Sequence, residues 1–99
     1  MLSTSMSVRE LQTEIAQWAD ELNPDRKPIG VIAKLLEEIA ELLASDLANP
    51  MELADVAILL LDLFHLAQID MAESVISKMA INRERSWIIK PDGRMQHVD

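Results

Sequence analysis

The segment 51–67 is apolar on almost every side of the helix that it would form, and this constrains the fold more than any other feature. Its only polar side chains are Glu52, Asp55, Asp62 and His65. A helix that is apolar all round has to be surrounded by other elements. A chain of 99 residues has few helices with which to surround it. We therefore expect further copies of the chain to bury the rest of this helix's apolar surface, in a homodimer or homotetramer.

The rest of the sequence predicts an all-α domain. Only 3% of residues are aromatic and only two are Gly, which argues against a β-sandwich or barrel. Apolar spacing and cap residues predict four helices, over 8–22, 29–46, 51–67 and 71–85. Asn49-Pro50 supplies the start of the third helix, and Asp70 is expected to cap the fourth. Short loops between such helices predict an antiparallel four-helix unit.

The ends of the chain are expected to be simpler than its helices. Residues 1–7 are expected to be a flexible start. Residues 86–99 contain Lys90-Pro91-Asp92-Gly93, a turn signal that predicts a short hairpin or an extended arm. With no linker or internal repeat, the sequence predicts a single domain over 1–99.

Charge and composition narrow the class of function. The sequence has nine Lys and Arg residues and 17 Asp and Glu residues, which gives a net charge of −8. This net charge argues against a nucleic-acid partner. The absence of Cys excludes disulfides and thiolate chemistry. Residues 1–7 lack the features of a signal peptide, and the longest apolar run, 56–61, is too short to span a bilayer. We expect a cytoplasmic protein with no membrane partner.

Two pairs of carboxylates carry the chemistry. Glu38 and Glu41 are three residues apart, and so are Glu52 and Asp55, so each pair shares one helix face. Antiparallel packing would bring the two faces to one seam, where burying a carboxylate costs several kcal/mol. Lys34 is the only nearby lysine or arginine on these helices and cannot neutralise four acids. A site of carboxylates alone indicates a hard ion, Mg²⁺ or Mn²⁺.

Plainer interpretations of the same residues stay open. Lys34 and Glu38 have the spacing of an ordinary ion pair, and Glu52 and Asp55 would complement a helix dipole. If the acids do no more than this, the chain is a non-catalytic helical dimerisation or interaction module. On the fourth helix, Lys78, Asn82 and Arg85 would hold phosphate and sugar, or form a solvated helix end. Trp18 would pack in the core or stack on a base.

The motif residues resemble those of the all-α nucleoside triphosphate pyrophosphohydrolases, which include the MazG proteins. The stretch from Lys34 to Leu42, followed by Glu52-Leu-Ala-Asp-Val56, resembles their ExxE…ExxD signature. Lys78, Asn82, Arg85 and Trp87, followed by Asp92-Gly93-Arg94 and His97-Val98, resemble small MazG-like dATP/dGTP diphosphohydrolases of phages and bacteria. The resemblance covers about 29–98. The interval from Glu41 to Glu52 is short for the family, which leaves little room for a base-specifying loop there.

The resemblance implies a site and a reaction. Its metal ligands would be Glu38, Glu41, Glu52 and Asp55, holding Mg²⁺ with Mn²⁺ as a substitute. The substrate would be a nucleoside triphosphate, with a lean towards a purine dNTP, cleaved between the α and β phosphates to monophosphate and pyrophosphate in nucleotide-pool house-cleaning. Glu37 and Glu41 are both candidates to orient or deprotonate the attacking water. The substrate-binding residues would be Lys34, Lys78, Asn82, Arg85 and Trp18.

Overall fold

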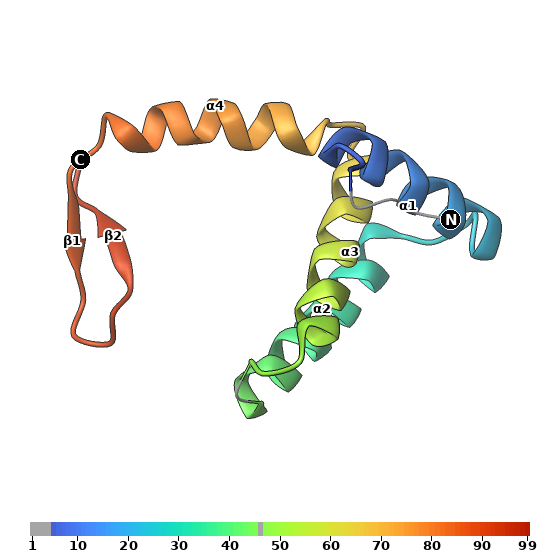
Figure 1. Ribbon diagram of the computed structural model, residues 1–99, viewed down its shortest axis with the longest axis horizontal. Helices are drawn as coiled ribbons and strands as arrows, with labels where there is room; N and C mark the ends of the chain where they lie inside the picture. Colours follow the sequence, from blue (N-terminus) through green and yellow to red (C-terminus); the bar gives the residue numbers. More distant parts are fainter. Residues whose placement is uncertain (1–4, 46) are drawn as a thin grey trace.

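The computed structural model describes residues 5–45 and 47–99, which form four helices followed by a two-stranded hairpin (Figure 1). The elements are α1 (Val8–Leu22), α2 (Pro28–Ala44), α3 (Pro50–Leu66), α4 (Met71–Arg83), β1 (Trp87–Ile89) and β2 (Met95–His97). The strands are antiparallel, with Trp87 opposite His97. The all-α class, the four helices and the C-terminal hairpin are confirmed. Residues 1–4 of the expected flexible start, and Asp46 at the expected end of the second helix, lie outside the described residues.

The helix starts follow local signals in the sequence. At α1, the Ser7 hydroxyl accepts a hydrogen bond from the Glu10 amide at 3.1 Å, and Glu10 accepts one from the Ser7 amide at 3.3 Å. At α3, the Asn49 side chain accepts a hydrogen bond from the Met51 amide at 2.9 Å, and Pro50 occupies the first turn. The predicted start of the third helix is therefore confirmed to within one residue.

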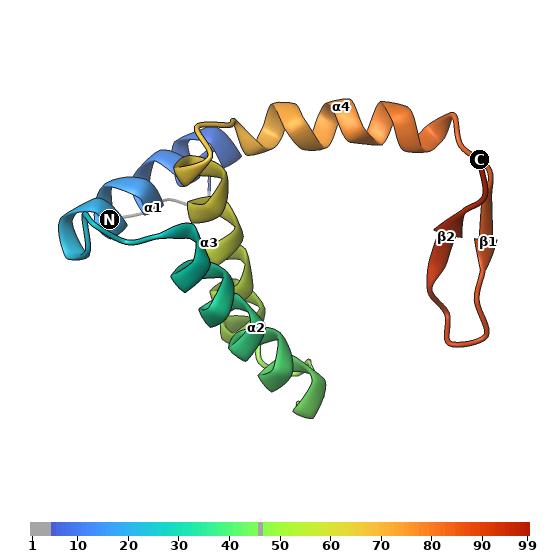
Figure 2. The ribbon, with the colours of Figure 1, turned by 180° about the vertical axis from the view of Figure 1, so that it is seen from behind.

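The helices are arranged as a compact corner with a projecting arm. Helices α2 and α3 run side by side, and α1 packs against α3 (Figure 1). Helix α4 contacts α1 and then runs away from α2 and α3, and it carries the hairpin at its far end, as the view from behind also shows (Figure 2). No residue of α4 is buried, and its apolar side chains do not form one face. The sequence did not indicate this position of the fourth helix.

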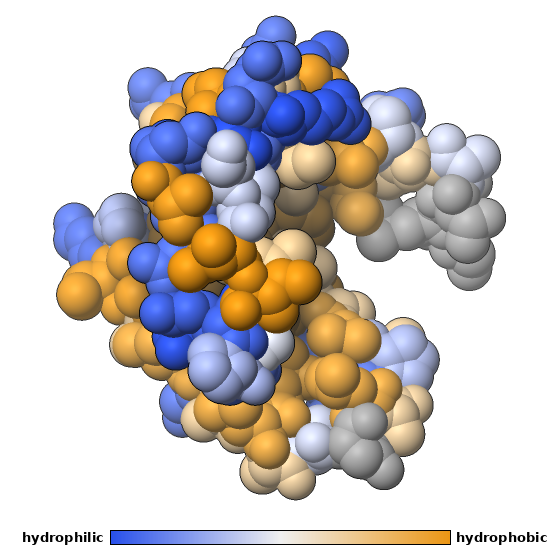
Figure 3. Space-filling view, turned by 90° about the vertical axis from the view of Figure 1, so that its left-hand side faces the viewer, coloured by the Kyte–Doolittle hydropathy of each residue, from blue (hydrophilic) through white to orange (hydrophobic). Residues whose placement is uncertain are grey.

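The single chain leaves much of its apolar surface uncovered. The buried hydrophobic residues are Ile15, Ala16, Ala19, Val31 and Leu61. The accessible surface is 7724 Å², about 2,000 Å² more than a compact chain of this mass exposes. The radius of gyration is 15.7 Å, where about 13 Å is typical of 100 residues. Apolar side chains lie over much of the face in Figure 3. This open shape supports the expectation that further copies complete the cover, which stays a prediction.

None of the helices formed by the described residues is long and apolar enough to cross a membrane.

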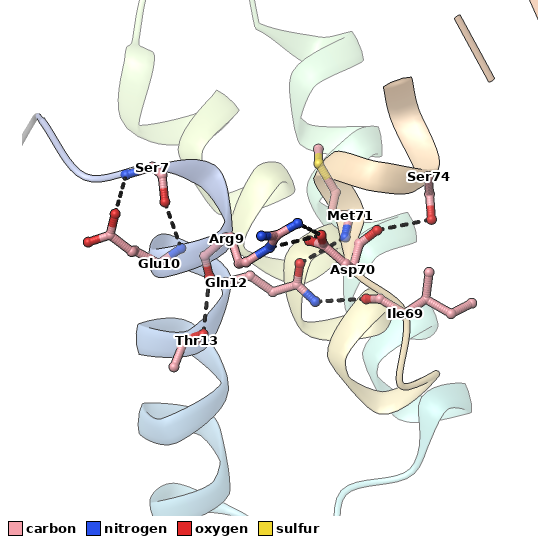
Figure 4. A network of polar contacts seen from close by, with 9 residues as sticks. All are labelled: Ser7, Arg9, Glu10, Gln12, Thr13, Ile69, Asp70, Met71 and Ser74. Carbon is pink, nitrogen blue, oxygen red and sulfur yellow. Dashed lines mark hydrogen bonds and ion pairs between the residues drawn. The ribbon is translucent and has the colours of Figure 1, made fainter. Parts of the chain in front are cut away.

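A set of polar contacts fixes the direction in which α4 leaves the corner (Figure 4). The Arg9 guanidinium donates to Asp70 Oδ2 through Nη2 at 2.6 Å and through Nε at 3.0 Å. The Gln12 side chain donates to the Ile69 carbonyl at 2.9 Å and accepts from the Met71 amide at 3.0 Å. Asp70 occupies the predicted cap position, but its side chain makes no capping hydrogen bond. The prediction that Asp70 caps the fourth helix is therefore confirmed for its position, while its carboxylate pairs with Arg9 and the Gln12 side chain accepts from the Met71 amide of the first turn.

The Arg9–Asp70 pair predicts a component of acid denaturation. The hydrogen bond from Arg9 lowers the pKa of Asp70 below its ordinary value. A carboxyl whose folded pKa is lowered stabilises the fold above its unfolded pKa of about 3.9, and this contribution disappears as the pH falls through the lower folded value. Arg9→Met should therefore flatten the fall of melting temperature with pH below about pH 4. Arg94→Met, which removes an exposed pair with Asp92 at 2.7 Å, is the control. Matching profiles for Arg9→Met and the parent protein would contradict the prediction.

Candidate functional site

The four predicted metal ligands lie on the two helices that pack side by side. Glu38 of α2 is buried, with 9% of its surface exposed, and Glu52 of α3 is half-buried. Glu41 and Asp55 are exposed. Within residues 5–45 and 47–99, however, no three acidic or histidine side chains gather closely enough to hold a metal ion. The fold therefore places both pairs on adjoining helices, without closing them into one cluster.

The electrostatics of α2 show an excess of negative charge. Lys34 Nζ lies 3.4 Å from Glu37 Oε2 and 3.4 Å from Glu38 Oε1, so the ion pair considered from the sequence is present. The negative charge of Glu38 raises the pKa of Glu41 above its ordinary value. One lysine thus serves two carboxylates, and Glu41 faces the repulsion of Glu38.

One carboxylate oxygen of Glu52, at the start of α3, is buried without a hydrogen-bond donor in the described part of the chain. Glu52 Oε2 is shielded from water and has no hydrogen-bond partner among the described residues. A buried carboxylate oxygen without a donor costs free energy unless a proton or a cation meets it. With Glu38 buried on the neighbouring helix, these residues fit a hard cation bound by carboxylate oxygens.

A groove lies at the junction of α1, α2 and α3, next to the carboxylates. Its volume is about 440 Å³. Its lining residues come from all three helices and the loop between α1 and α2: Trp18, Ala19, Leu22, Asn23, Arg26, Lys27, Gly30, Val31, Lys34, Leu59 and Asp62. Trp18 is 58% exposed and borders this groove, so it is not a core residue of the single chain. Its role in stacking on a base stays a prediction.

The floor of the groove holds an ion pair that the sequence did not predict. Arg26 Nη2 lies 2.6 Å from Asp62 Oδ1, and Arg26 Nε lies 2.8 Å from Asp62 Oδ2. The side chain of Arg26 is 8% exposed and that of Asp62 is 7% exposed. Arg26 also donates to Asp20 Oδ1 at 2.8 Å, and this hydrogen bond lowers the pKa of Asp20. His65 Nε2 lies 3.4 Å from Asp20 Oδ2. The signal in the sequence was Asp62, an acid within an apolar helix that needs a partner.

The predicted phosphate-binding residues lie on the projecting arm. Lys78 is exposed, Asn82 is half-buried, and Arg85 follows the end of α4 at Arg83. Asn82 Oδ1 is buried without a hydrogen-bond partner among the described residues, and the Asn82 carbonyl accepts from the Trp87 indole at 2.9 Å. Because α4 runs away from α2 and α3, these side chains lie apart from the carboxylates of their own chain (Figure 1). One chain alone does not bring the two sets together.

Comparison with known proteins gives the family. A model of the dATP/dGTP pyrophosphohydrolase family matches residues 11–99. A dATP/dGTP diphosphohydrolase of Cyanophage S-2L is 57% identical over 93 residues, which are 93% of this chain and 89% of that protein. A dATP/dGTP diphosphohydrolase of Salmonella phage PMBT28 is 47% identical over 92 residues, 93% of this chain but only 32% of that longer protein.

The fold agrees with the family. The solved structure of the Cyanophage S-2L MazG-like pyrophosphohydrolase, bound to dGDP and three catalytic Mn²⁺ ions per active site, matches with a TM-score of 0.90 and 55% identity over 98% of both chains. These findings decide between the two functional hypotheses in favour of an enzyme over a non-catalytic module. The chain belongs to the dATP/dGTP pyrophosphohydrolase family and is a pyrophosphohydrolase with the MazG-like fold.

Proposed function

We propose that this enzyme hydrolyses purine deoxynucleoside triphosphates between the α and β phosphates, with Mg²⁺ as its metal and Mn²⁺ as a substitute. Water adds to the α phosphorus, the bond to the bridging oxygen breaks, and the products are the deoxynucleoside monophosphate and pyrophosphate. The observation that carries the proposal is the unpartnered, buried Glu52 oxygen beside the helix that holds buried Glu38. The bound dGDP and Mn²⁺ of the Cyanophage S-2L relative support it.

The carboxylates have the chemistry to hold the metal. Glu38, Glu41, Glu52 and Asp55 supply only oxygen ligands, which Mg²⁺ and Mn²⁺ prefer. When bound, the metal neutralises the charge of the triphosphate and polarises its phosphoryl oxygens. Without it, a chain of net charge −8 would repel a polyanion. Glu41 and Glu37 are the two candidates to orient the attacking water or accept its proton, since both lie beside Glu38 on α2.

The basic side chains would hold the phosphates. Lys34 already lies beside Glu37 and Glu38, so it can exchange a carboxylate partner for a phosphate oxygen. Lys78, Asn82 and Arg85 belong to the arm, which packs against α1 and runs away from the α2–α3 pair that carries the carboxylates. We propose that the arm of one copy delivers these residues to the carboxylates of another, in a homodimer or homotetramer. The surface excess over a compact chain supports such an assembly.

A product assay on a panel of nucleotides tests the reaction. We expect dATP and dGTP to yield monophosphate and pyrophosphate in equal amounts, because attack at the α phosphorus releases both outer phosphates as one group. The activity should require Mg²⁺ or Mn²⁺ and fail with Ca²⁺, whose longer bonds and looser geometry misplace the water. The measurement is anion-exchange chromatography of the products. Orthophosphate as the first product, or full activity in excess chelator, would overturn the mechanism.

A further inference from the structure

The contacts between α1 and the start of α4 point to two residues that influence the reaction without touching the substrate. We propose that Arg9 and Gln12 are positioning residues, which hold the start of α4 and so orient Lys78 and Asn82 toward the carboxylates of another copy. This inference rests on the proposed function and deepens it, because it says what keeps α4 in the direction that a shared site requires.

Helix α4 receives little support from apolar packing. It packs against α1, and this contact lies at the start of α4 (Figure 1). No residue of α4 is buried, and every residue from Val75 to Ile81 is exposed. A buried apolar face usually sets how a helix lies on its neighbours. Since α4 has no such face within one chain, its direction depends on the contacts of its first residues.

The link between α3 and α4 is held on one side by α3. The Gln68 amide donates to the His65 carbonyl at 2.9 Å, and the Ile69 amide donates to the Phe64 carbonyl at 2.9 Å. Gln68 has a φ of 60°, the left-handed conformation in which many helices end. These contacts end α3 and fix the point at which Ile69 leaves it.

Gln12 of α1 holds the other side of the link (Figure 4). Its side-chain nitrogen donates to the Ile69 carbonyl at 2.9 Å, and its side-chain oxygen accepts from the Met71 amide at 3.0 Å. Hydrogen bonds weaken steeply when their angles change. One planar amide that meets backbone groups on both sides of Asp70 therefore restricts the rotation of this segment as well as its position.

Arg9 adds a charge-assisted contact at the residue between these two. Its Nε and Nη2 both donate to Asp70 Oδ2, at 3.0 and 2.6 Å. The Asp70 carbonyl in turn accepts from the Ser74 amide at 3.1 Å and from the Ser74 hydroxyl at 3.0 Å, within the first turn of α4. Arg9 and Gln12 thus hold three consecutive residues, 69–71, at the point where α4 begins.

The length of α4 magnifies any change at its start. Asn82 lies 11 positions after Met71, about 17 Å away along a helix that rises about 1.5 Å per residue. A tilt of about 10° at Met71 would therefore move Asn82 by about 3 Å. A displacement of about 1 Å can lower a rate about 100-fold when it misplaces groups that hold the substrate. The contacts of residues 69–71 therefore matter for side chains near the far end of α4.

Removal of the polar groups of Gln12 or Arg9 tests this role. In Gln12→Met and Arg9→Met, α4 should spend less time in the direction that brings Lys78 to the phosphates. KM for dATP and dGTP should then rise about tenfold, because the apparent dissociation constant increases as the competent fraction falls. A saturating substrate holds α4 in place, so kcat should fall less than about threefold. Steady-state kinetics measure both constants.

Gln17→Met is the matched control. Gln17 is an exposed residue of α1 whose side chain forms no hydrogen bond within the described part of the chain. Its kinetics should match those of the parent enzyme. Circular dichroism and sedimentation should show that all three variants keep their helices and their assembly. If Gln12→Met does not fold, Arg9→Met gives the same test, because the Arg9 side chain is 67% exposed.

Mixed assemblies show whether the effect acts through α4. Asp55→Ala chains keep an intact α4, and Lys78→Ala chains keep all four carboxylates, so the two refolded together should form shared sites. Gln12→Met added to the Asp55→Ala chains should lower the recovered kcat/KM about tenfold, because these chains supply α4. The same change added to the Lys78→Ala chains should alter it less than about twofold, because their α4 already lacks the phosphate contact.

The outcomes separate this inference from the proposed function. An unchanged KM in the variants of Gln12 and Arg9 would overturn the positioning role. An equal loss from Gln12→Met in either chain of the mixture would also overturn it, in favour of a general contribution to stability. If the mixture without Gln12→Met recovered no activity, the shared site would fail. If the parent enzyme released no pyrophosphate from dATP or dGTP, the proposed reaction itself would fail.

Discussion

Asp55→Ala is expected to reduce pyrophosphate release by about 100-fold or more, because it removes a ligand of the proposed metal site. Asp55 is exposed on α3, so its loss should leave the helical content unchanged. The parent enzyme should gain about 2.7 kcal/mol of stability from Mg²⁺ at 100 times its Kd, whereas the variant should gain little. Product chromatography, circular dichroism and thermal melting with and without Mg²⁺ measure these three effects.

A matched control and a mixing experiment sharpen this prediction. Asp25→Ala removes an exposed acid from the loop between α1 and α2 and should keep full activity.

If α4 serves another copy's carboxylates, Asp55→Ala and Lys78→Ala chains are each inactive alone but form some intact sites when they are refolded together. Sedimentation would show whether they assemble. Recovery of activity supports the shared site, whereas a compact monomer, or an active Asp55→Ala enzyme, would contradict it.

The second large effect is expected at the buried Arg26–Asp62 pair. Arg26→Met would leave the Asp62 carboxylate buried at 7% exposure without its partner, a change that costs about 3–5 kcal/mol. For a chain of this size, each kcal/mol lowers the melting temperature by about 4–8 °C. Denaturant and thermal unfolding at one fixed protein concentration measure the loss, since stability also depends on assembly.

Further variants distinguish charge burial from packing. The double variant Arg26→Met, Asp62→Leu also removes the buried carboxylate that lost its partner. It should therefore recover much of the stability that Arg26→Met loses. Asp20 is the second partner of Arg26, and the side chain of Asp20 is 52% exposed. Asp20→Asn should therefore lower the stability much less than Arg26→Met does. If the double variant were as unstable as Arg26→Met alone, lost packing of the arginine would explain the effect better than the uncompensated carboxylate.

The local features of this protein could be predicted from its sequence. The start of α3 depends on Asn49 and Pro50, and the side-by-side placement of each carboxylate pair depends on a spacing of three residues within one helix. Such features are decided by interactions within about one helical turn, which the sequence displays directly. The motif residues allowed the family to be inferred for the same reason, because the signature consists of local spacings on two helices.

The tertiary structure alone decided the features that join distant residues. Arg26 meets Asp62 across 36 positions, and Arg9 meets Asp70 across 61. The first pair lies on the floor of the groove between α1, α2 and α3, and the second joins α1 to the start of α4, which runs away from α2 and α3. Spacing cannot reveal such pairs, because the choice of partner depends on how complete helices pack and on which charges that packing buries. The sequence therefore determined the chemistry available to this enzyme, whereas packing decided which residues share a site.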